Sequence, residues 1–101
     1  MGEVVVRYRV KPDRVEENER LVRGVYAELA ERDPGGIRYA TFRLADGVTF
    51  VHVASVDTAD GSNPLSDVGA FADFTRDIAE RCDEPPLALD ATVVGSYGLF
   101  G

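Results

Sequence analysis

The stretch from Ile37 to Asp57, IRYATFRLADGVTFVHVASVD, decides the fold class of this chain. β-Branched and aromatic residues fill both of its halves, and Ala45-Asp46-Gly47 separates them, which is typical of two β-strands joined by a tight turn. The second half also carries His52, the single histidine of the chain. This stretch therefore predicts a β-hairpin that holds the only imidazole of the protein.

Two turn types fit the hairpin, and they differ by one residue in register. A three-residue loop that ends on Gly47 at positive φ gives a type I turn with a bulge, and it sets Phe42 opposite Phe50. A two-residue turn instead pairs Phe42 with Val51. We favour the bulged turn because it places Phe42 and Phe50 on one strongly apolar face together with His52.

The opposite face of the hairpin is mixed rather than polar. It includes Tyr39, Thr41, Val51 and Val53, so neither face is suited to full exposure to water. Helices can cover one face of the sheet. We expect a second copy of the chain to cover the other, which would make the protein a homodimer through its open sheet face, with Tyr39 in the interface.

Periodicity predicts four further elements along the chain. They are a strand over Val4–Val10, a helix from about Arg14 to Arg32, a second helix between Ser66 and Cys82, and a last strand over Ala91–Tyr97. Asp13 and Glu16 fit a capping box at the start of the first helix. Gly69 marks the regular start of the second helix, and Asp83-Glu84-Pro85-Pro86 is interpreted as the break that follows it.

The element order is therefore βαββαβ. Right-handed crossovers place both helices on the same face of one antiparallel sheet with strand order 4-1-3-2. A chain of 101 residues is long enough for one domain with a real core. We predict a single ferredoxin-like α+β sandwich over residues 1–101.

Charge and composition exclude several classes of partner. The formal net charge is −7 and the basic residues are spread along the chain, so nucleic acid and membrane surfaces are poor partners. No apolar run approaches the roughly 18–20 residues that span a bilayer, and the N-terminus lacks a signal-peptide pattern, so we expect a cytoplasmic protein. Cys82 stands alone, which predicts a packing role and no disulfide, and a single histidine predicts no metal site.

The chain resembles the dimeric α+β-barrel superfamily, and most closely the antibiotic biosynthesis monooxygenase-type domains. The resemblance spans nearly the whole chain and rests on the VVVRYRVKP opening, the amphipathic first helix, the Phe-led strand TFVHVAS, a second helix that contains Phe, and a short final strand. It implies that two sheets pack face to face in a dimeric barrel. It also implies a pocket in each subunit between the sheet and the helices.

The resemblance implies several activities, which the residues narrow. Family members include cofactor-free oxygenases of aromatic polyketide-like substrates, haem-degrading enzymes and proteins without established activity. This chain has no Trp, Ala54 and Val56 occupy third-strand positions where a Glu and an aromatic are often found, and Asn63-Pro64-Leu65 stands where a His is frequent. These departures argue against haem degradation, and we expect no cofactor.

His52 is the candidate catalytic residue. A neutral imidazole in an apolar pocket can remove a phenolic proton and so start oxidation by O₂ without metal or flavin. The structural alternative is a hydrogen-bonded core or interface histidine. Aromatic side chains from both layers are expected to line the substrate pocket, namely Tyr8, Tyr26, Phe42, Phe50 and Phe74.

Two functions follow from these observations. The first is a cofactor-independent monooxygenase-like oxidoreductase that binds a small apolar or aromatic metabolite between the sheet and the helices. The second is a non-catalytic dimeric module that binds a ligand or serves a structural role. The missing Trp and the lack of an acid or base partner for His52 favour the second, and a packed gap between the sheet and the helices, with no room for a ligand, would favour it further.

Overall fold

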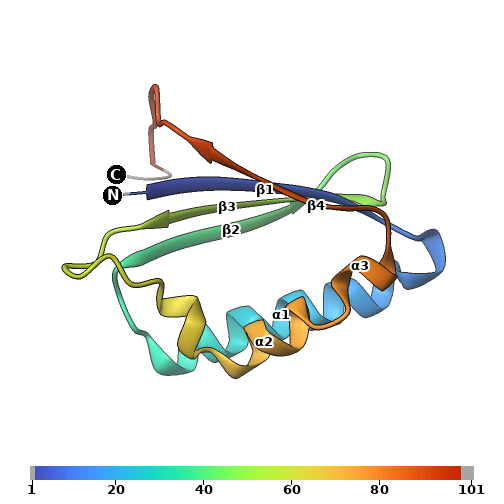
Figure 1. Ribbon diagram of the computed structural model, residues 1–101, viewed down its shortest axis with the longest axis horizontal. Coiled ribbons are helices and arrows are strands. Elements are labelled where there is room, and N and C mark those ends of the chain that lie inside the picture. The colour runs from blue at the N-terminus through green and yellow to red at the C-terminus, as the bar shows by residue number, and fades with distance from the viewer. Residues whose placement is uncertain (1, 99–101) are drawn as a thin grey trace.

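The computed structural model describes residues 2–98. It is an α+β structure with one sheet and its helices on one side (Figure 1). The elements in chain order are β1 (Gly2–Val10), η1 (Pro12–Arg14), α1 (Val15–Arg32), β2 (Ile37–Arg43), β3 (Thr49–Val56), η2 (Pro64–Asp67), α2 (Gly69–Thr75), α3 (Ile78–Arg81) and β4 (Cys82–Ala91).

The sheet has the predicted topology. Its order is β2-β3-β1-β4, and every neighbouring pair is antiparallel. The helices cover one face, as right-handed crossovers require, and the core between the layers is built on Tyr8, Val10, Val25 and Phe50. The ferredoxin-like βαββαβ fold is therefore confirmed.

The register of the hairpin differs from the one that we favoured. Phe42 pairs with Val51 and Thr41 with His52. Gly47 does close a tight turn, with φ 80° and its N–H donating to the Leu44 carbonyl at 2.9 Å. The strands are nevertheless joined by four residues instead of three, because Leu44 pairs next with Thr49.

Asp46 explains this longer loop. Its carboxylate accepts hydrogen bonds from the backbone N–H groups of Val48 and Thr49 and from the Thr49 hydroxyl, while the Val48 carbonyl accepts from Val10 in β1. Val48 is thereby withdrawn from the β2–β3 ladder. The one-residue shift turns Phe42 to the sheet face opposite His52, and 47% of Phe42 is exposed there. The same shift brings Thr41 to the face that carries His52.

The first helix begins one residue later than predicted and without the capping box. Lys11 to Arg14 close a 3₁₀ turn, with the Arg14 N–H donating to the Lys11 carbonyl at 2.8 Å. Asp13 lies inside that turn, so it makes no cap, and α1 starts at Val15 with no side-chain cap. The inward stripe of α1 includes Val22 and Val25, as predicted.

The predicted second helix is divided in two. Regular helix starts at Gly69, as expected, but it stops before Arg76, which is extended, and Asp77, which is left-handed with φ 59°. The buried Arg81 guanidinium donates to the carbonyls of Phe74 and Arg76 and so satisfies the end of α2. The break leaves Cys82 outside the helix, as the first residue of β4.

The last strand lies earlier in the chain than predicted. We interpreted Pro85-Pro86 as a break and Ala91–Tyr97 as the strand, whereas β4 runs from Cys82 to Ala91. Proline is tolerated here because β4 is an edge strand, and the two prolines fall where its register against β1 shifts between Arg7 and Arg9. Residues 92–98 form no strand, and the place beside β1 that was predicted for them is taken by β4.

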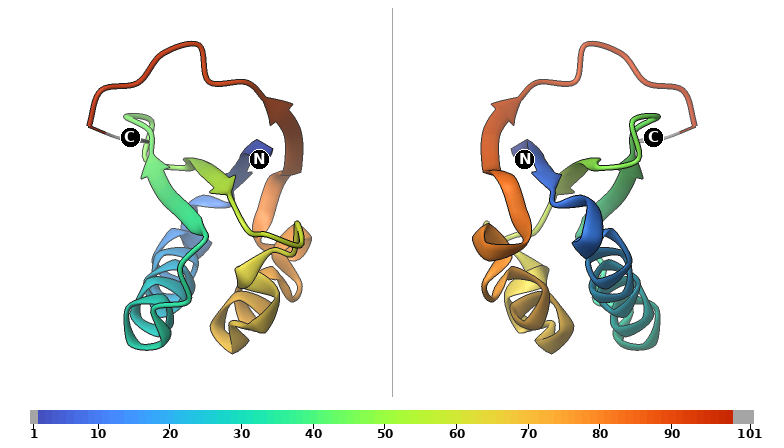
Figure 2. Two further views of the ribbon diagram at one scale, coloured as in Figure 1. Left: turned by 90° about the vertical axis from the view of Figure 1, so that its left-hand side faces the viewer. Right: turned by 90° about the vertical axis from the view of Figure 1, so that its right-hand side faces the viewer.

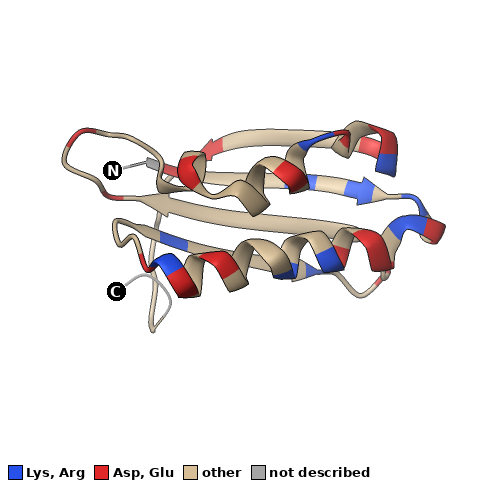
Figure 3. Cartoon of the chain, turned by 90° about the horizontal axis from the view of Figure 1, so that it is seen from below, with Lys and Arg blue, Asp and Glu red and all other residues tan. Residues whose placement is uncertain are grey.

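The segment after β4 crosses above the sheet face that carries no helix (Figure 2). Its Val94 and Tyr97 side chains are almost fully exposed. On the helix side, acidic and basic residues are interleaved along α1 (Figure 3). Within residues 2–98, no helix is long and apolar enough to cross a membrane.

Glu28 of α1 links this helix to the start of α2. Its carboxylate accepts from the N–H groups of Gly69 at 3.0 Å and Ala70 at 2.9 Å, so α1 supplies the N-terminal cap of α2. We expect Glu28→Ala to lower the melting temperature measured by circular dichroism. Glu31→Ala, the same change at an exposed position of α1, is the control; equal melting temperatures for the two variants would contradict this role.

Candidate functional site

A cavity of about 300 Å³ lies between the sheet and the segment that contains η2, α2 and α3. Its volume is at the lower end of the range for small-molecule pockets, about 300–1,000 Å³. Most of its wall is aliphatic or aromatic, and its polar side chains are few. The lining residues are Val4, Val6, Tyr8, Tyr39, His52, Ala54, Val56, Asn63, Leu65, Phe71, Phe74, Thr75, Ile78 and Pro86.

His52 is the polar centre of this wall. It lies in the middle of β3 and is 3% exposed. Its Nε2 is 2.7 Å from the Tyr8 hydroxyl in β1, and its Nδ1 is 2.6 Å from the Tyr39 hydroxyl in β2 and 3.1 Å from Thr41 Oγ1. Each ring nitrogen therefore already has a hydroxyl partner from a neighbouring strand.

The hydrogen bonds extend from the sheet to α1 at two points. Asn18 Nδ2 donates to the Tyr8 hydroxyl at 3.0 Å, and the Tyr26 hydroxyl lies 2.8 Å from Thr41 Oγ1. Asn18 is fully buried, and it is not among the site residues predicted from the sequence. Asn18 precedes Val22 by four residues and therefore lies on the apolar face of the helix, and this spacing was the sequence signal for its burial.

Aromatic rings fix the position of the imidazole. Phe74 of α2 stacks on His52 with ring centroids 5.3 Å apart, and Phe50 stacks on Tyr8 at 5.6 Å. The guanidinium carbon of Arg81 lies over the Phe74 ring, 5.7 Å from the ring centroid. The broken helix thus holds one wall of the cavity against the sheet.

Burial keeps the whole network uncharged at neutral pH. Desolvation lowers the pKa of His52 to about 4 and raises the pKa of Tyr8 and Tyr39 far above the ordinary value. The pKa of Tyr26 is also raised by burial. An uncharged imidazole between two uncharged phenols can exchange protons along its hydrogen bonds without carrying charge in the resting state.

Some of the predicted pocket residues line the cavity, and others lie behind its wall. Tyr8, His52 and Phe74 line the cavity. Phe50 packs behind Tyr8, and Tyr26 contacts the His52 network through its hydrogen bond to Thr41 and its stacking on Tyr39.

Two aromatic residues lie on the opposite sides of the sheet from those predicted. Phe42 points to the uncovered face and is 47% exposed, so it does not line this cavity. Tyr39, predicted for the dimer face, instead faces the helices and bonds to His52. Both corrections follow from the one-residue shift of the hairpin.

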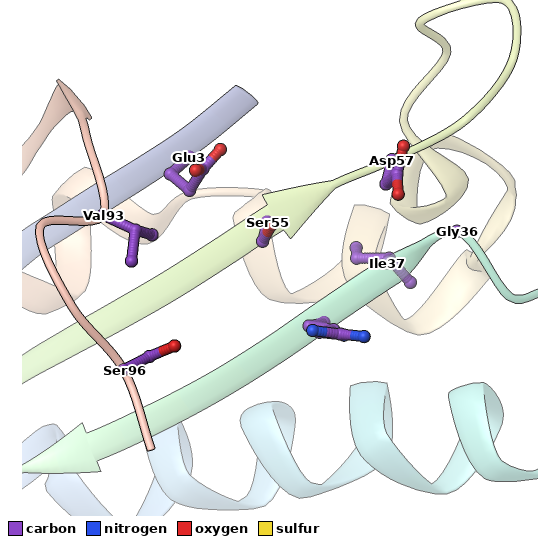
Figure 4. Close-up of a pocket in the computed structure, with 8 residues that line it drawn as sticks. Glu3, Gly36, Ile37, Ser55, Asp57, Val93 and Ser96 are labelled. Carbon is purple, nitrogen blue, oxygen red and sulfur yellow. The ribbon is translucent and has the colours of Figure 1, made fainter. Parts of the chain in front are cut away.

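A second hollow, of about 540 Å³, lies on the uncovered face beneath the segment after β4 (Figure 4). Its walls come from β1, β2, β3 and the crossing segment, and they are partly charged and open to solvent. The residues are Glu3, Gly36, Ile37, Arg38, Ser55, Asp57, Val93 and Ser96. Its wall carries Glu3, Arg38 and Asp57, so the more apolar His52 cavity is the better candidate for a small-molecule site.

Within residues 2–98, no group of three His, Cys, Asp or Glu side chains is placed to hold a metal ion. Cys82 is a free, buried thiol whose pKa is raised by burial. The polar groups of the cavity are hydroxyls, one amide and one imidazole, a set suited to hydrogen bonds with an organic ligand.

The fold and the site define an α+β sandwich with a small ligand cavity between its layers, and the comparisons place this architecture among solved structures. The chain has the fold of the antibiotic biosynthesis monooxygenase-like domains. No family model matches its sequence, and no curated protein matches it.

Three solved structures illustrate the likeness. A candidate antibiotic biosynthesis monooxygenase from Nitrosomonas europaea superposes with a TM-score of 0.74 at 20% identity, over 94% of this chain and 100% of that one. Another from Caulobacter crescentus gives 0.70 at 18% identity, over 93% and 90%. A variant of SnoaB, a cofactor-independent oxygenase from Streptomyces nogalater, gives 0.68 at 18% identity, over 96% of both chains.

The low pKa of His52 predicts that stability falls as the solution is acidified. The unfolded imidazole binds a proton below its ordinary pKa of 6.5, while the folded one does so only near pH 4. Lowering the pH from 7.5 to 5 should therefore reduce the free energy of unfolding by about 2 kcal/mol. Urea titrations should show this loss, and His52→Gln should remove most of it; an unchanged pH dependence in the variant would contradict the assignment.

Proposed function

We propose that the protein binds a small apolar or aromatic metabolite in the cavity between its layers and oxygenates it with O₂, without a metal or organic cofactor. The observation that carries the proposal is a largely apolar cavity whose wall contains the single histidine, bonded to two tyrosines. The fold supports the proposal by analogy, since a cofactor-independent oxygenase shares it.

The proposed reaction is the conversion of an activated phenol to a quinone. Loss of the hydroxyl proton makes the ring an electron-rich anion that can reduce O₂. The substrate then loses two hydrogens and gains one oxygen atom as a second carbonyl. The other oxygen atom leaves with the two hydrogens as water, so substrate and O₂ balance without a further reductant.

In this proposal, His52 exchanges protons with the ligand. Both of its ring nitrogens are already bonded to tyrosine hydroxyls. A ligand proton therefore reaches or leaves the imidazole through a tyrosine hydroxyl, and Tyr39 and Tyr8 both line the cavity. Apolar contacts with Phe74 and the aliphatic wall hold the ring of the ligand.

The same geometry supports a second function, a ligand-binding module without catalysis. Because each nitrogen of His52 has a partner within 2.7 Å, the cavity offers no unbonded base to a substrate. In this function His52 and its tyrosines orient the ligand by hydrogen bonds and perform no chemistry. Oxygen consumption with a bound ligand separates the two functions.

We further propose that the protein is a homodimer through the uncovered sheet face. Large apolar side chains stand exposed there on β2 and β4, namely Phe42 at 47%, Leu87 at 58% and Leu89 at 55%. A face of this kind is more apolar than a monomer normally exposes. Packing two such faces against each other would cover these side chains and leave the His52 cavity, on the opposite side of each sheet, intact.

Native mass spectrometry of the gently purified protein tests the site. We expect a dimer that carries a reproducible small-molecule mass, and we expect Ala54→Phe, which fills the cavity floor, to lose that mass. Ala72→Phe, the same change at an exposed position of α2 outside the cavity lining, is the control. A bare wild-type protein that also binds no aromatic ligand would contradict the ligand site, and a monomer would contradict the proposed interface.

Oxygen uptake then tests the chemistry on the ligand identified in this way. His52→Ala should abolish uptake while the dimer persists. Unchanged turnover in this variant would remove His52 from the mechanism, and ligand binding without any uptake by the wild type would favour the non-catalytic module.

A further inference from the structure

We propose that Asn18 fixes the direction of the hydrogen bonds around His52, so that the Tyr39 hydroxyl presents its proton to the cavity. The site then selects ligands that bring an acceptor oxygen, such as a ketone or a phenolate. The inference rests on the ligand cavity of the proposed function and names the chemistry of the ligand. Asn18 does not line the cavity, so it acts as a positioning residue.

The first step is the contact between Asn18 and Tyr8. The amide Nδ2 can only donate, so the Tyr8 oxygen accepts at 3.0 Å. This orientation leaves Asn18 Oδ1 without a partner among the described residues. Within residues 2–98, the observed orientation leaves Oδ1 and one N–H of Nδ2 unbonded, whereas the reverse orientation would leave both N–H groups unbonded, and an unpaired buried N–H is rarer in proteins than an unpaired carbonyl oxygen.

The second step follows from the single proton of a hydroxyl. Because the Tyr8 oxygen already accepts from Asn18, its own proton is free for the other contact of this hydroxyl, His52 Nε2 at 2.7 Å. With that proton directed to Nε2 and not into the cavity, Nε2 is the unprotonated nitrogen of the neutral ring. The ring proton is consequently on Nδ1, which donates to the Tyr39 oxygen at 2.6 Å in preference to Thr41 Oγ1 at 3.1 Å.

The third step concerns the proton of Tyr39. Its oxygen accepts the Nδ1 proton, and the nearby Thr41 Oγ1 is engaged with Tyr26 at 2.8 Å and lies 3.1 Å from Nδ1. The Tyr39 O–H is therefore the donor that remains for a ligand, and Tyr39 lines the cavity. The sequence of donors is Asn18 to Tyr8 to His52 to Tyr39, and the last donor faces the ligand.

With this direction of the hydrogen bonds, the site offers a donor to the oxygen of a bound phenol. A donor hydrogen-bonds to the ligand oxygen and stabilises the negative charge that develops there when a phenol loses its proton. The anion is the form that reacts with O₂ in the proposed reaction. His52 then holds Tyr39 as the donor to that oxygen.

The decisive experiment uses the wild-type protein, because a single histidine gives one pair of ring nitrogen signals. Protein labelled with ¹⁵N-histidine should show a protonated Nδ1 and an unprotonated Nε2 in two-bond ¹H–¹⁵N correlation spectra at neutral pH. A protonated Nε2 would overturn the inference, whatever ligand the cavity binds. This result needs no ligand, so it is independent of the proposed function.

Variants test whether Asn18 sets the tautomer. Asn18→Leu removes the donor to Tyr8, so we expect the Nε2-protonated ring to appear as a substantial fraction. Val22→Ala, one turn along the same face of α1, reduces packing without touching the hydrogen bonds and should keep the wild-type spectrum. A wild-type spectrum for Asn18→Leu would show that Asn18 is not the positioning residue.

A matched pair of ligands tests the selection of an acceptor oxygen. Tetralone and tetralin share one carbon frame and differ by a ketone oxygen. Tyr39→Phe should weaken tetralone binding about tenfold and leave tetralin binding unchanged, as followed by the ring signals of His52. Equal effects on both ligands would overturn the proposed ligand class, and failure of the wild type to bind either would count against the ligand site itself.

Discussion

The structure depends on one buried imidazole held between two tyrosine hydroxyls. His52 is covered by the sheet, by α1 and by the broken helix, and burial keeps it neutral by lowering its pKa to about 4. A neutral ring needs one donor and one acceptor, and Tyr8 and Tyr39 occupy its two nitrogens. Because β1, β3 and β2 each supply one of the three side chains, the network also fixes how these strands meet. It joins the fold to the candidate site.

The fold class could be predicted from the sequence because strong local signals agree with it. Alternation and the Gly47 turn predicted the hairpin, and helical spacing predicted α1. The misplaced details depend on contacts that no local pattern reports. Asp46 lengthens the loop through its own hydrogen bonds, and Pro85-Pro86 is compatible with a strand only because β4 is an edge strand with a shifted register.

The candidate site could be predicted only in part for the same reason. The single histidine and a buried tyrosine on the first strand pointed to His52 and Tyr8. The partner on the other side, Tyr39, depended on a register that differed by one residue, and the role of Asn18 was not predicted from the sequence. Structures of antibiotic biosynthesis monooxygenase-like proteins share the fold at 15–20% identity. At that distance the likeness carries the architecture, and the chemistry has to be argued from this chain's own side chains.

The most direct test of the account is an NMR titration of the His52 ring between pH 8 and pH 5. The single Cε1–H signal reports the charge of the imidazole without interference from other histidines. A neutral ring between two tyrosines predicts a signal that stays constant down to about pH 5. A midpoint between pH 6 and pH 7, as for an imidazole in water, would show that His52 is open to solvent and would contradict both the network and the cavity built on it.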